Sequence, residues 1–227
     1  MDAESLLNCW DQGRRRHPID RALLLYAAAV PGEDPETLAD RPLGERNAAL
    51  LRMRQELFGD ALKSCVECPQ CGERLEFSLS AEMLLARTGE PECAESHVLV
   101  NGSRVRRPTT RDLACIAREP DESGAASKLL ARLCATDMTL PYDEVARALD
   151  AADPCLDLGI DLACPQCAHP WTAALDVPAF LWEEIEVRAR RLLDEVHLLA
   201  RSYHWREADI LRLSEARRRA YLDRVLA

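Results

Sequence analysis

Apolar residues in the first 60 positions recur at helical spacing in two runs that polar residues separate. One helix is predicted over 19–30 and ends at Pro31-Gly32, and a second is predicted over 43–58 and ends at Gly59, because proline and glycine commonly flank helices. The second run has one apolar face, formed by Ala49, Leu50, Met53 and Leu57. We expect this face to pack against the first helix, with a polar connector between the two.

The middle of the chain predicts a β-hairpin and several helices. Asn101-Gly102 lies between the stretches 97–100 and 103–107, and an Asn-Gly pair is a strong signal for a two-residue hairpin turn. One helix is expected before this hairpin, over 81–88. Three more are expected after it, from a cap at Thr109 or Thr110 to Arg118, from Ser123 to about Thr136, and from Pro141 to Asp153.

A heptad pattern is the most regular feature of the chain. Seven residues are spaced alternately by three and four: Trp182, Ile185, Ala189, Leu192, Val196, Leu199 and Tyr203. Three heptads are marginal for a free-standing coiled coil, so this seam packs either on the protein's own helices, which we favour, or against another chain. Short helices over 205–213 and 215–226 are expected to follow, the second capped by Ser214. Their expected apolar anchors are Ile210, Leu213, Tyr221 and Val225.

The chain also contains an internal repeat with a constant offset of 96 residues. The tetrapeptide Cys-Pro-Gln-Cys occurs at 68–71 and again at 164–167. Leucines match around it, namely Leu62 with Leu158, Leu79 with Leu175, and Leu85 with Leu181. The segments 75–79 and 171–175 alternate large apolar residues with small or polar ones, which predicts half-buried strands. Each half is therefore predicted to contain a cysteine knuckle, a strand and a helix.

The two cysteine pairs predict a divided metal site. Pairs with a two-residue spacer can supply the four sulfur ligands of a tetrahedral structural zinc ion, here Cys68, Cys71, Cys164 and Cys167. Two facing hairpins that share such an ion form a zinc ribbon. The 92 residues between Cys71 and Cys164 must form structure of their own. Closing a loop of that length costs about 4 kcal/mol, whereas structural zinc contributes about 10 kcal/mol or more, so the spacing is compatible with the site.

Two alternatives to this ligand set are open in the sequence. Cys65 and Cys68 form another pair with the same spacing, but only Cys68 and Cys71 share the proline and the flanking pattern of the second copy. His169, two residues after Cys167, is a weaker alternative to a cysteine ligand. The remaining cysteines are expected to be small buried hydrophobic residues: Cys9, Cys93, Cys115, Cys134 and Cys155.

Composition narrows the classes of function. The 227 residues carry a formal net charge of −10, which disfavours binding to a phosphate backbone. The arginine runs at 14–16 and 217–219 are interpreted as solvated faces, with contacts to an acidic protein as the alternative. The longest apolar run, 22–30, is far shorter than the roughly 20 residues of a membrane span. Because residues 1–16 are polar and charged, with no signal segment, we expect a reducing, cytoplasmic location rather than a disulfide framework.

The sequence has no recognisable catalytic motif. It lacks the His-x-Glu segment of zinc deaminases, a phosphate-binding loop, a dinucleotide-binding turn and a Gly-x-Ser-x-Gly elbow. Four cysteine ligands would also leave a zinc ion without an open position for water. We therefore expect a non-enzymatic protein, with a nucleic-acid-associated or regulatory zinc ribbon as the alternative.

Together these patterns predict a mainly α fold with small β content, an α+β helical body around a split zinc ribbon. A chain of 227 residues is long enough to bury a substantial core. We expect an N-terminal helical region at 1–60, a ribbon made from 61–80 and 156–178, an inserted hairpin and helical region at 81–155, and C-terminal amphipathic helices at 179–227.

Five segments follow one another in an order that is typical of a known family. They are Gly44-Glu45-Arg46 through Phe58-Gly59, Cys68-Pro69-Gln70-Cys71-Gly72-Glu73, Arg107-Pro108-Thr109-Thr110-Arg111-Asp112-Leu113, Cys164-Pro165-Gln166-Cys167, and Tyr203-His204-Trp205-Arg206-Glu207 through Tyr221-Leu222. In this order the chain resembles the zinc-knuckle baseplate or baseplate hub assembly proteins of contractile-tailed phages and related injection systems. The resemblance implies an assembly role without enzymatic activity, baseplate or hub subunits as partners, and incorporation into a tail-like particle. Cys65, and Ala168 in place of a knuckle glycine, depart from the pattern.

Overall fold

The computed structural model describes residues 1–86, 97–134 and 140–226. The fold is mostly helical with small antiparallel sheets, in agreement with the expected α+β class. The helices are α1 (Ala3–Gly13), α2 (Pro18–Ala29), α3 (Pro35–Ala39), α4 (Leu43–Phe58), α5 (Ala81–Ala86), α6 (Thr110–Ile116), α7 (Glu122–Leu133), α8 (Tyr142–Ala152), α9 (Val177–Tyr203), α10 (Glu207–Leu211) and α11 (Glu215–Leu226). The strands pair as three separate hairpins, β1 (Ala61–Glu67) with β2 (Arg74–Ser80), β3 (His97–Val100) with β4 (Ser103–Arg106), and β5 (Gly159–Ala163) with β6 (Pro170–Ala174).

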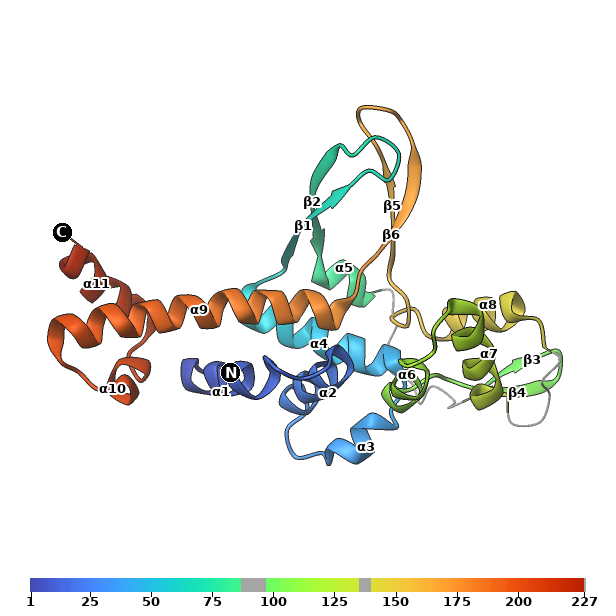
Figure 1. Cartoon of the computed structure of the whole chain (residues 1–227), viewed down its shortest axis with the longest axis horizontal. Coiled ribbons are helices and arrows are strands. Elements are labelled where there is room, and N and C mark those ends of the chain that lie inside the picture. The colour runs from blue at the N-terminus through green and yellow to red at the C-terminus, as the bar shows by residue number, and fades with distance from the viewer. Residues whose placement is uncertain (87–96, 135–139, 227) are drawn as a thin grey trace.

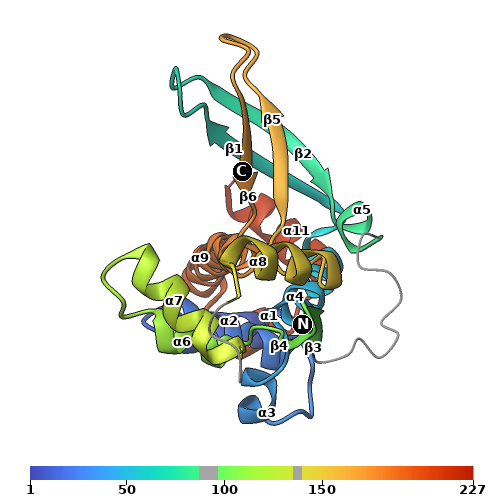
Figure 2. The ribbon, with the colours of Figure 1, turned by 90° about the vertical axis from the view of Figure 1, so that its right-hand side faces the viewer.

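The long helix α9 organises the molecule (Figure 1). Helices α1, α2 and α4 pack along one side of it, and α10 and α11 contact its C-terminal part. The hairpins β1–β2 and β5–β6 rise from its other side, while the segment from β3 to α8 lies at the end of the molecule opposite α11 (Figures 1 and 2). The heptad seam therefore packs on the protein's own helices, which is the favoured alternative. None of the helices in the described ranges combines the length and the apolar content that crossing a bilayer requires.

The main apolar core lies where these helices meet. Leu25 of α2, Leu50 of α4 and Leu181 of α9 are fully buried in it. The hairpins β1–β2 and β5–β6 are called the tall hairpins below. Their bases join the same core through Leu62 and Leu158, which are equivalent positions in the 96-residue repeat. Both hairpins are therefore anchored in the helical body at their bases.

A second apolar cluster lies within the inserted segment. Its buried members are Val100, Val105, Leu133, Cys134, Leu140, Val145 and Leu149. The turn of the β3–β4 hairpin follows the Asn-Gly prediction, because Asn101 and Gly102 both have positive φ angles, of 51° and 81°. The insertion thus has apolar packing of its own.

Polar contacts join this insertion to the start of α4. The backbone N–H of Gly44 donates to the Asp153 carboxylate at 3.2 Å, and a β-carbon on Gly44 would lie only 1.6 Å from that carboxylate. Arg107 contacts the same carboxylate at 3.5 Å. The side-chain amide of Asn47 donates to the carbonyl of Cys155 at 2.8 Å. Buried hydrogen bonds of this kind specify one docking geometry between the two segments.

Two helices near the N-terminus differ from the sequence prediction. Helix α1 has no counterpart in that prediction, although Asp2 caps it by accepting a hydrogen bond from the Ser5 N–H at 2.8 Å, and Leu6 and Leu7 are buried. The polar connector predicted between α2 and α4 instead contains the short helix α3. Its Leu38 is buried in the main core and Ala39 is also buried, so two apolar residues anchor an otherwise polar segment.

The other helices either have bounds close to those predicted or are shorter than predicted. Thr109 is the cap of α6 and forms a reciprocal capping box with Asp112. The helix predicted over 205–213 is reduced to α10, whereas α11 has the predicted bounds. The predicted helix ends at 87–88 and 135–136 lie outside the described residues, as does Cys93.

The arginine run 217–219 is not wholly solvated, contrary to the prediction, because Arg218 is only 3% exposed. Its Nε donates to the Glu195 carboxylate of α9 at 2.9 Å, and its Nη1 donates to the Leu213 carbonyl at 2.6 Å. Glu195 is buried beside the half-buried seam residue Val196. A buried ion pair therefore holds α11 against α9, whereas the run 14–16 is exposed as predicted.

Candidate metal centre

The four cysteines of the repeated tetrapeptide meet at the tips of the two tall hairpins. Cys68 and Cys71 lie in the turn that joins β1 to β2, and Cys164 and Cys167 lie in the turn that joins β5 to β6. Both turns point away from the helical body, at the top of Figures 1 and 2. The site is therefore built by two segments that are distant in sequence and anchored at their bases in one core.

The two turns have the same backbone hydrogen bonds. In the first, the Cys68 N–H donates to the Glu73 carbonyl at 2.8 Å, and the Gly72 N–H donates to the Cys68 carbonyl at 2.9 Å. In the second, Cys164 N–H donates to the His169 carbonyl at 3.0 Å. Ala168 N–H likewise donates to the Cys164 carbonyl at 2.9 Å. The 96-residue repeat is thus a repeat of local structure, with each turn presenting two sulfurs to the same point.

The sulfur atoms are spaced as the ligands of one metal ion. All four Sγ atoms lie within 4.8 Å of one another. Between the turns, Cys68 Sγ is 3.7 Å from Cys167 Sγ, and Cys71 Sγ is 3.6 Å from Cys164 Sγ. A tetrahedral zinc ion with Zn–S bonds of about 2.3 Å has sulfur–sulfur edges of about 3.8 Å. A disulfide would bring two sulfurs to about 2.05 Å, so these separations fit coordination and not a disulfide.

Burial follows the same two-fold pattern. The first cysteine of each pair, Cys68 or Cys164, is buried, and the second, Cys71 or Cys167, is exposed. One side of the cluster therefore faces protein and the other faces solvent. An ion held by these sulfurs would be shielded by the turns while remaining close to the surface.

The pKa shifts of Cys71 and Cys164 favour a bound cation. Burial raises the pKa of Cys164, but the N–H groups of Cys167 and Gln166 outweigh it and lower this pKa to about 7. The N–H of Glu73 lowers the pKa of Cys71, yet burial and the neighbouring thiols outweigh this and raise it to about 12. The first thiolate is therefore stabilised by the turn, and later ones are opposed by the charge already present. A divalent cation removes that opposition, because metal binding releases the thiol protons.

The two alternative ligands lie outside the cluster. Cys65 is exposed on β1, opposite Glu76, and its sulfur accepts a hydrogen bond from Arg74 at 3.4 Å. His169 contributes its backbone carbonyl to the second turn, and its ring stacks on Trp171 at a centroid distance of 6.3 Å. Neither side chain belongs to the group of four thiols.

The remaining described cysteines are dispersed. Cys9 and Cys155 are buried in the main core, and Cys134 is buried in the second apolar cluster. These three agree with the prediction of small buried residues. Cys115 is only partly buried.

The backbone donors of the turns are the part of the site that the sequence pattern does not reveal. The backbone N–H groups of Gln166 and Cys167 donate to the Cys164 sulfur, and the N–H of Glu73 donates to the Cys71 sulfur. A side-chain motif indicates only the ligands, whereas these donors depend on how the turn folds. The signal that could have indicated them is Gly72, which permits the positive φ angle of 76° at the end of the turn.

Comparison with known proteins identifies no relative of this chain. No protein-family model matches it, and neither a curated protein nor a solved structure matches it. Its function is therefore inferred from the thiol geometry, from the internal repeat and from the order of the sequence segments.

Proposed function

We propose that Cys68, Cys71, Cys164 and Cys167 bind one structural zinc ion that joins the tips of the two tall hairpins into a split zinc ribbon. The observation that carries this proposal is the spacing of the sulfurs, 3.6 and 3.7 Å between turns, close to the edge of a zinc tetrathiolate. Zinc and iron both accept tetrahedral sulfur ligands. Zinc is proposed because the site joins distant segments and needs no redox partner.

The energetics also support a metal at this position. Each tall hairpin has only two strands, and in the part of the chain that the structure describes neither pairs with a strand of the other hairpin. Two-stranded hairpins are at best marginally stable in water. Core packing anchors their bases, so a metal at the tips would order the remaining length, at a binding free energy of about 10 kcal/mol or more.

We further propose that the protein has a non-enzymatic assembly role in a contractile tail or injection-system baseplate, where it binds baseplate or hub subunits. The support is the order of the segments that resemble this family, together with an ion whose four cysteine ligands leave no position for a reacting water. The net charge of −10 favours protein partners over nucleic acid.

Metal analysis and serine variants test the zinc proposal. We expect one equivalent of zinc per chain in protein purified under reducing conditions, and a loss of several kcal/mol in the free energy of unfolding for Cys68→Ser or Cys164→Ser. Cys65→Ser is the matched control, since Cys65 lies outside the cluster. It should keep both zinc and stability. One equivalent of iron, or well under one equivalent of any metal, contradicts the proposal.

Affinity purification from the native cell tests the assembly role separately. A tagged chain should co-purify with baseplate or hub subunits, and this recovery should decrease in Cys68→Ser if the ribbon contributes to the interaction. Absence of the protein from both assembly intermediates and finished particles would reject the role while leaving the zinc site intact. A salt-dependent association with DNA or RNA at micromolar concentration would instead support the nucleic-acid alternative.

A further inference from the structure

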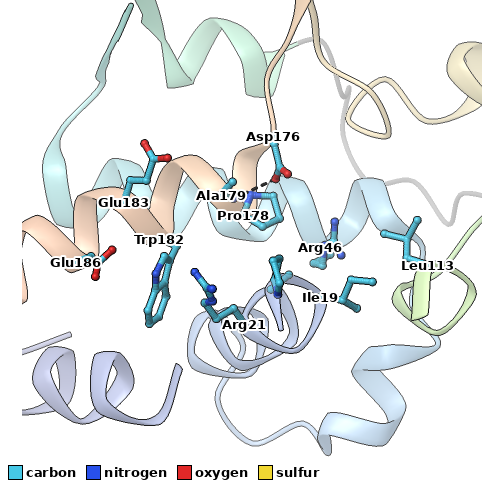
Figure 3. A pocket seen from close by; sticks show the side chains of 12 residues that line it. Ile19, Arg21, Arg46, Leu113, Asp176, Pro178, Ala179, Trp182, Glu183 and Glu186 are labelled. Atoms are coloured by element: carbon cyan, nitrogen blue, oxygen red, sulfur yellow. Dashed lines mark hydrogen bonds between the residues drawn. The ribbon is translucent and has the colours of Figure 1, made fainter. Parts of the chain in front are cut away.

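A cavity of about 300 Å³ opens between α2, α4, α6 and the start of α9 (Figure 3). Its walls are largely apolar, with Ile19 and Trp182 among the residues that line it. Two arginines and three carboxylates complete the lining: Arg46, Arg21, Asp176, Glu183 and Glu186. No cysteine contributes to the cavity, so it is independent of the proposed zinc site.

Arg46 is unusual among the buried arginines. It is 6% exposed, and its guanidinium donates only to neutral oxygens, at 3.0 and 3.2 Å to Asn47 Oδ1 and at 3.2 Å to Thr110 Oγ1. The other buried arginines each have a carboxylate partner, Arg54 with Glu184 at 2.7 Å, Arg107 with Asp153 at 3.5 Å, and Arg218 with Glu195 at 2.9 Å. Within the described residues, no carboxylate forms an ion pair with Arg46.

The neighbouring charges do not neutralise Arg46. The main acidic influence on it comes from Asp176, which caps α9 by accepting from the Ala179 N–H at 3.0 Å. Burial outweighs the effect of Asp176 and lowers the pKa of Arg46 to about 10. Glu183 and Glu186 lie on the α9 side, away from Arg46 (Figure 3).

One end of the cavity therefore holds Arg46, near Asp176 but not ion-paired with it, and the rest is mainly apolar. A guanidinium has five N–H groups in a planar fork, and three of those of Arg46 are used by Asn47 and Thr110. Beyond Arg46, the indole of Trp182 provides an aromatic wall, over which Arg21 stacks with its guanidinium carbon 5.0 Å from the ring centroid. The α2 and α9 helices both begin at this cavity, and helix N-termini favour negative charge.

We propose that this cavity binds a carboxylate attached to a short apolar body, with the carboxylate at Arg46 and the body against Trp182 and Ile19. A carboxylate is the group that pairs best with a guanidinium fork, and burial strengthens the pairing because water does not compete. The carboxylate could belong to a free acid or to an acidic side chain of a protein partner. Both sources share the same recognition chemistry.

Titration of the full chain with hexanoate and hexanamide tests this inference, because the two compounds share an apolar body and differ in charge. The readout is the NMR shift of the Trp182 indole N–H. Hexanoate should bind with a dissociation constant of about 1 mM, as expected for a small fragment, and hexanamide at least about tenfold more weakly. A capped peptide with Glu between leucines, compared with its Gln counterpart, distinguishes the sources. Binding of the Glu peptide assigns the site to a partner's side chain, and binding of hexanoate alone assigns it to a free acid.

Two variants connect this binding to the cavity. Arg46→Gln should weaken hexanoate binding at least about tenfold, but it also removes the Thr110 contact and could disturb the fold. Ala179→Leu avoids that difficulty, because Ala179 is exposed and lines the cavity, so a larger side chain fills it. Ala220→Leu on the exposed face of α11 is the matched control and should bind hexanoate as the unmodified chain does. Equal binding of hexanoate and hexanamide, or unchanged hexanoate binding in Ala179→Leu, overturns the inference.

Discussion

Gly72 and Ala168 occupy equivalent positions at the ends of the two cysteine turns. Both have left-handed backbone conformations, with φ of 76° and 57°. A β-carbon is unfavourable in this conformation by about 1 kcal/mol, and nothing lies within 4 Å of the position where one would be added to Gly72. The cost of a β-carbon at Gly72 is therefore conformational and does not depend on packing.

This equivalence predicts opposite effects for exchanged residues. Ala168→Gly should raise the free energy of unfolding by about 1 kcal/mol, and Gly72→Ala should lower it by a similar amount. Denaturant unfolding of the metal-loaded proteins measures both. The double variant, which exchanges the two residues, should have nearly the stability of the original chain. Stabilisation by Gly72→Ala would contradict the left-handed geometry.

Asp112 predicts a dependence of stability on pH. Burial raises its pKa, but hydrogen bonds from Arg106 and Arg132 outweigh burial and hold the pKa well below its usual value. The resulting stabilisation is fully present above the unfolded pKa of about 4 and is lost as the pH falls towards the folded value. Asp112→Asn should therefore cost about 2 to 3 kcal/mol at pH 7, and the difference from the original chain should shrink below pH 4.

Denaturant unfolding of both proteins at pH 7 and pH 3 measures this difference. Subtracting one protein from the other cancels the acid sensitivity of the thiol cluster, which both share. Asp223→Asn, on the exposed surface of α11, is the control and should be neutral. A pH-independent difference for Asp112→Asn would show that lost packing, and not the charge, is responsible.

The sequence patterns predicted which cysteines meet, but they did not predict which charged residues are buried. The repeated Cys-Pro-Gln-Cys identified the four cysteines that meet, because a two-residue spacer and its flanking pattern are local properties. Arg46, Arg218 and Glu195 were not predicted to be buried. Charged residues are usually solvated, and only the position of a partner elsewhere in the fold indicates otherwise.

Helix α11 is held on α9 by a buried ion pair and by aromatic packing. Arg218 is its only buried residue and pairs with Glu195, and the half-buried Tyr221 packs edge-on against Tyr203 and Trp205. Arg218→Met leaves the buried Glu195 paired only with the exposed Arg191, at 3.2 Å, so it should destabilise the docked helix by about 3 kcal/mol. Hydrogen exchange should increase over 215–226 while exchange in α4 remains unchanged.

Two further variants separate charge from packing in α11. Arg219→Met removes an exposed arginine of the same run and should have little effect. Combining Arg218→Met with Glu195→Leu should recover most of the loss, because no buried charge is then left unpaired. Failure of the double variant to recover stability would assign the role of Arg218 to its contact with the Leu213 carbonyl.

Element prediction succeeded where periodicity or turn chemistry was strong. The heptad seam of α9, the Asn-Gly turn between β3 and β4, and the bounds of α4 agree with the pattern. Helix α3 was missed because five residues are too few to show a period, and α1 was missed because residues 1–16 were interpreted as a polar, charged segment. Tertiary packing of Leu6, Leu7 and Leu38 supplies the stability that local propensity does not.

The arrangement of the whole molecule places its two apolar clusters far from the thiols. The thiol cluster is at the free tips of the hairpins, whereas the clusters lie in the helical body and the insertion. If the proposed zinc is bound, its removal with a chelator should therefore increase hydrogen exchange in β1, β2, β5 and β6 first. The insertion should keep its protection, since its own apolar cluster does not include β1, β2, β5 or β6.

Hydrogen exchange before and after chelation, followed by addition of zinc, measures this order of loss. Restored protection of the hairpins on adding zinc, but not on adding magnesium, is the expected result, because thiolates are poor ligands for magnesium. Equal loss of protection in α7 and α8 would contradict it, since the insertion would then depend on the metal.

How the insertion docks on the body could not be predicted from the sequence. Its position depends on contacts between distant residues, such as the Gly44 N–H with Asp153 and Asn47 with the Cys155 carbonyl. Periodicity indicates that an apolar face exists, but not which polar groups meet at its edge. The 96-residue repeat is the exception, because its constant offset relates two distant segments through the sequence alone.

Because the two cysteine turns are far apart in the sequence, the ribosome makes them at different times. Cys71 leaves the ribosome 93 residues before Cys164 does. At a translation rate of about 5 to 20 residues per second, the first turn waits about 5 to 20 s for the second. During that interval Cys68 and Cys71 are exposed to cellular oxidants, and the proposed zinc ion can join the hairpin tips only once Cys164 and Cys167 have been made. Zinc scarcity or oxidative stress should therefore harm newly made chains more than mature ones.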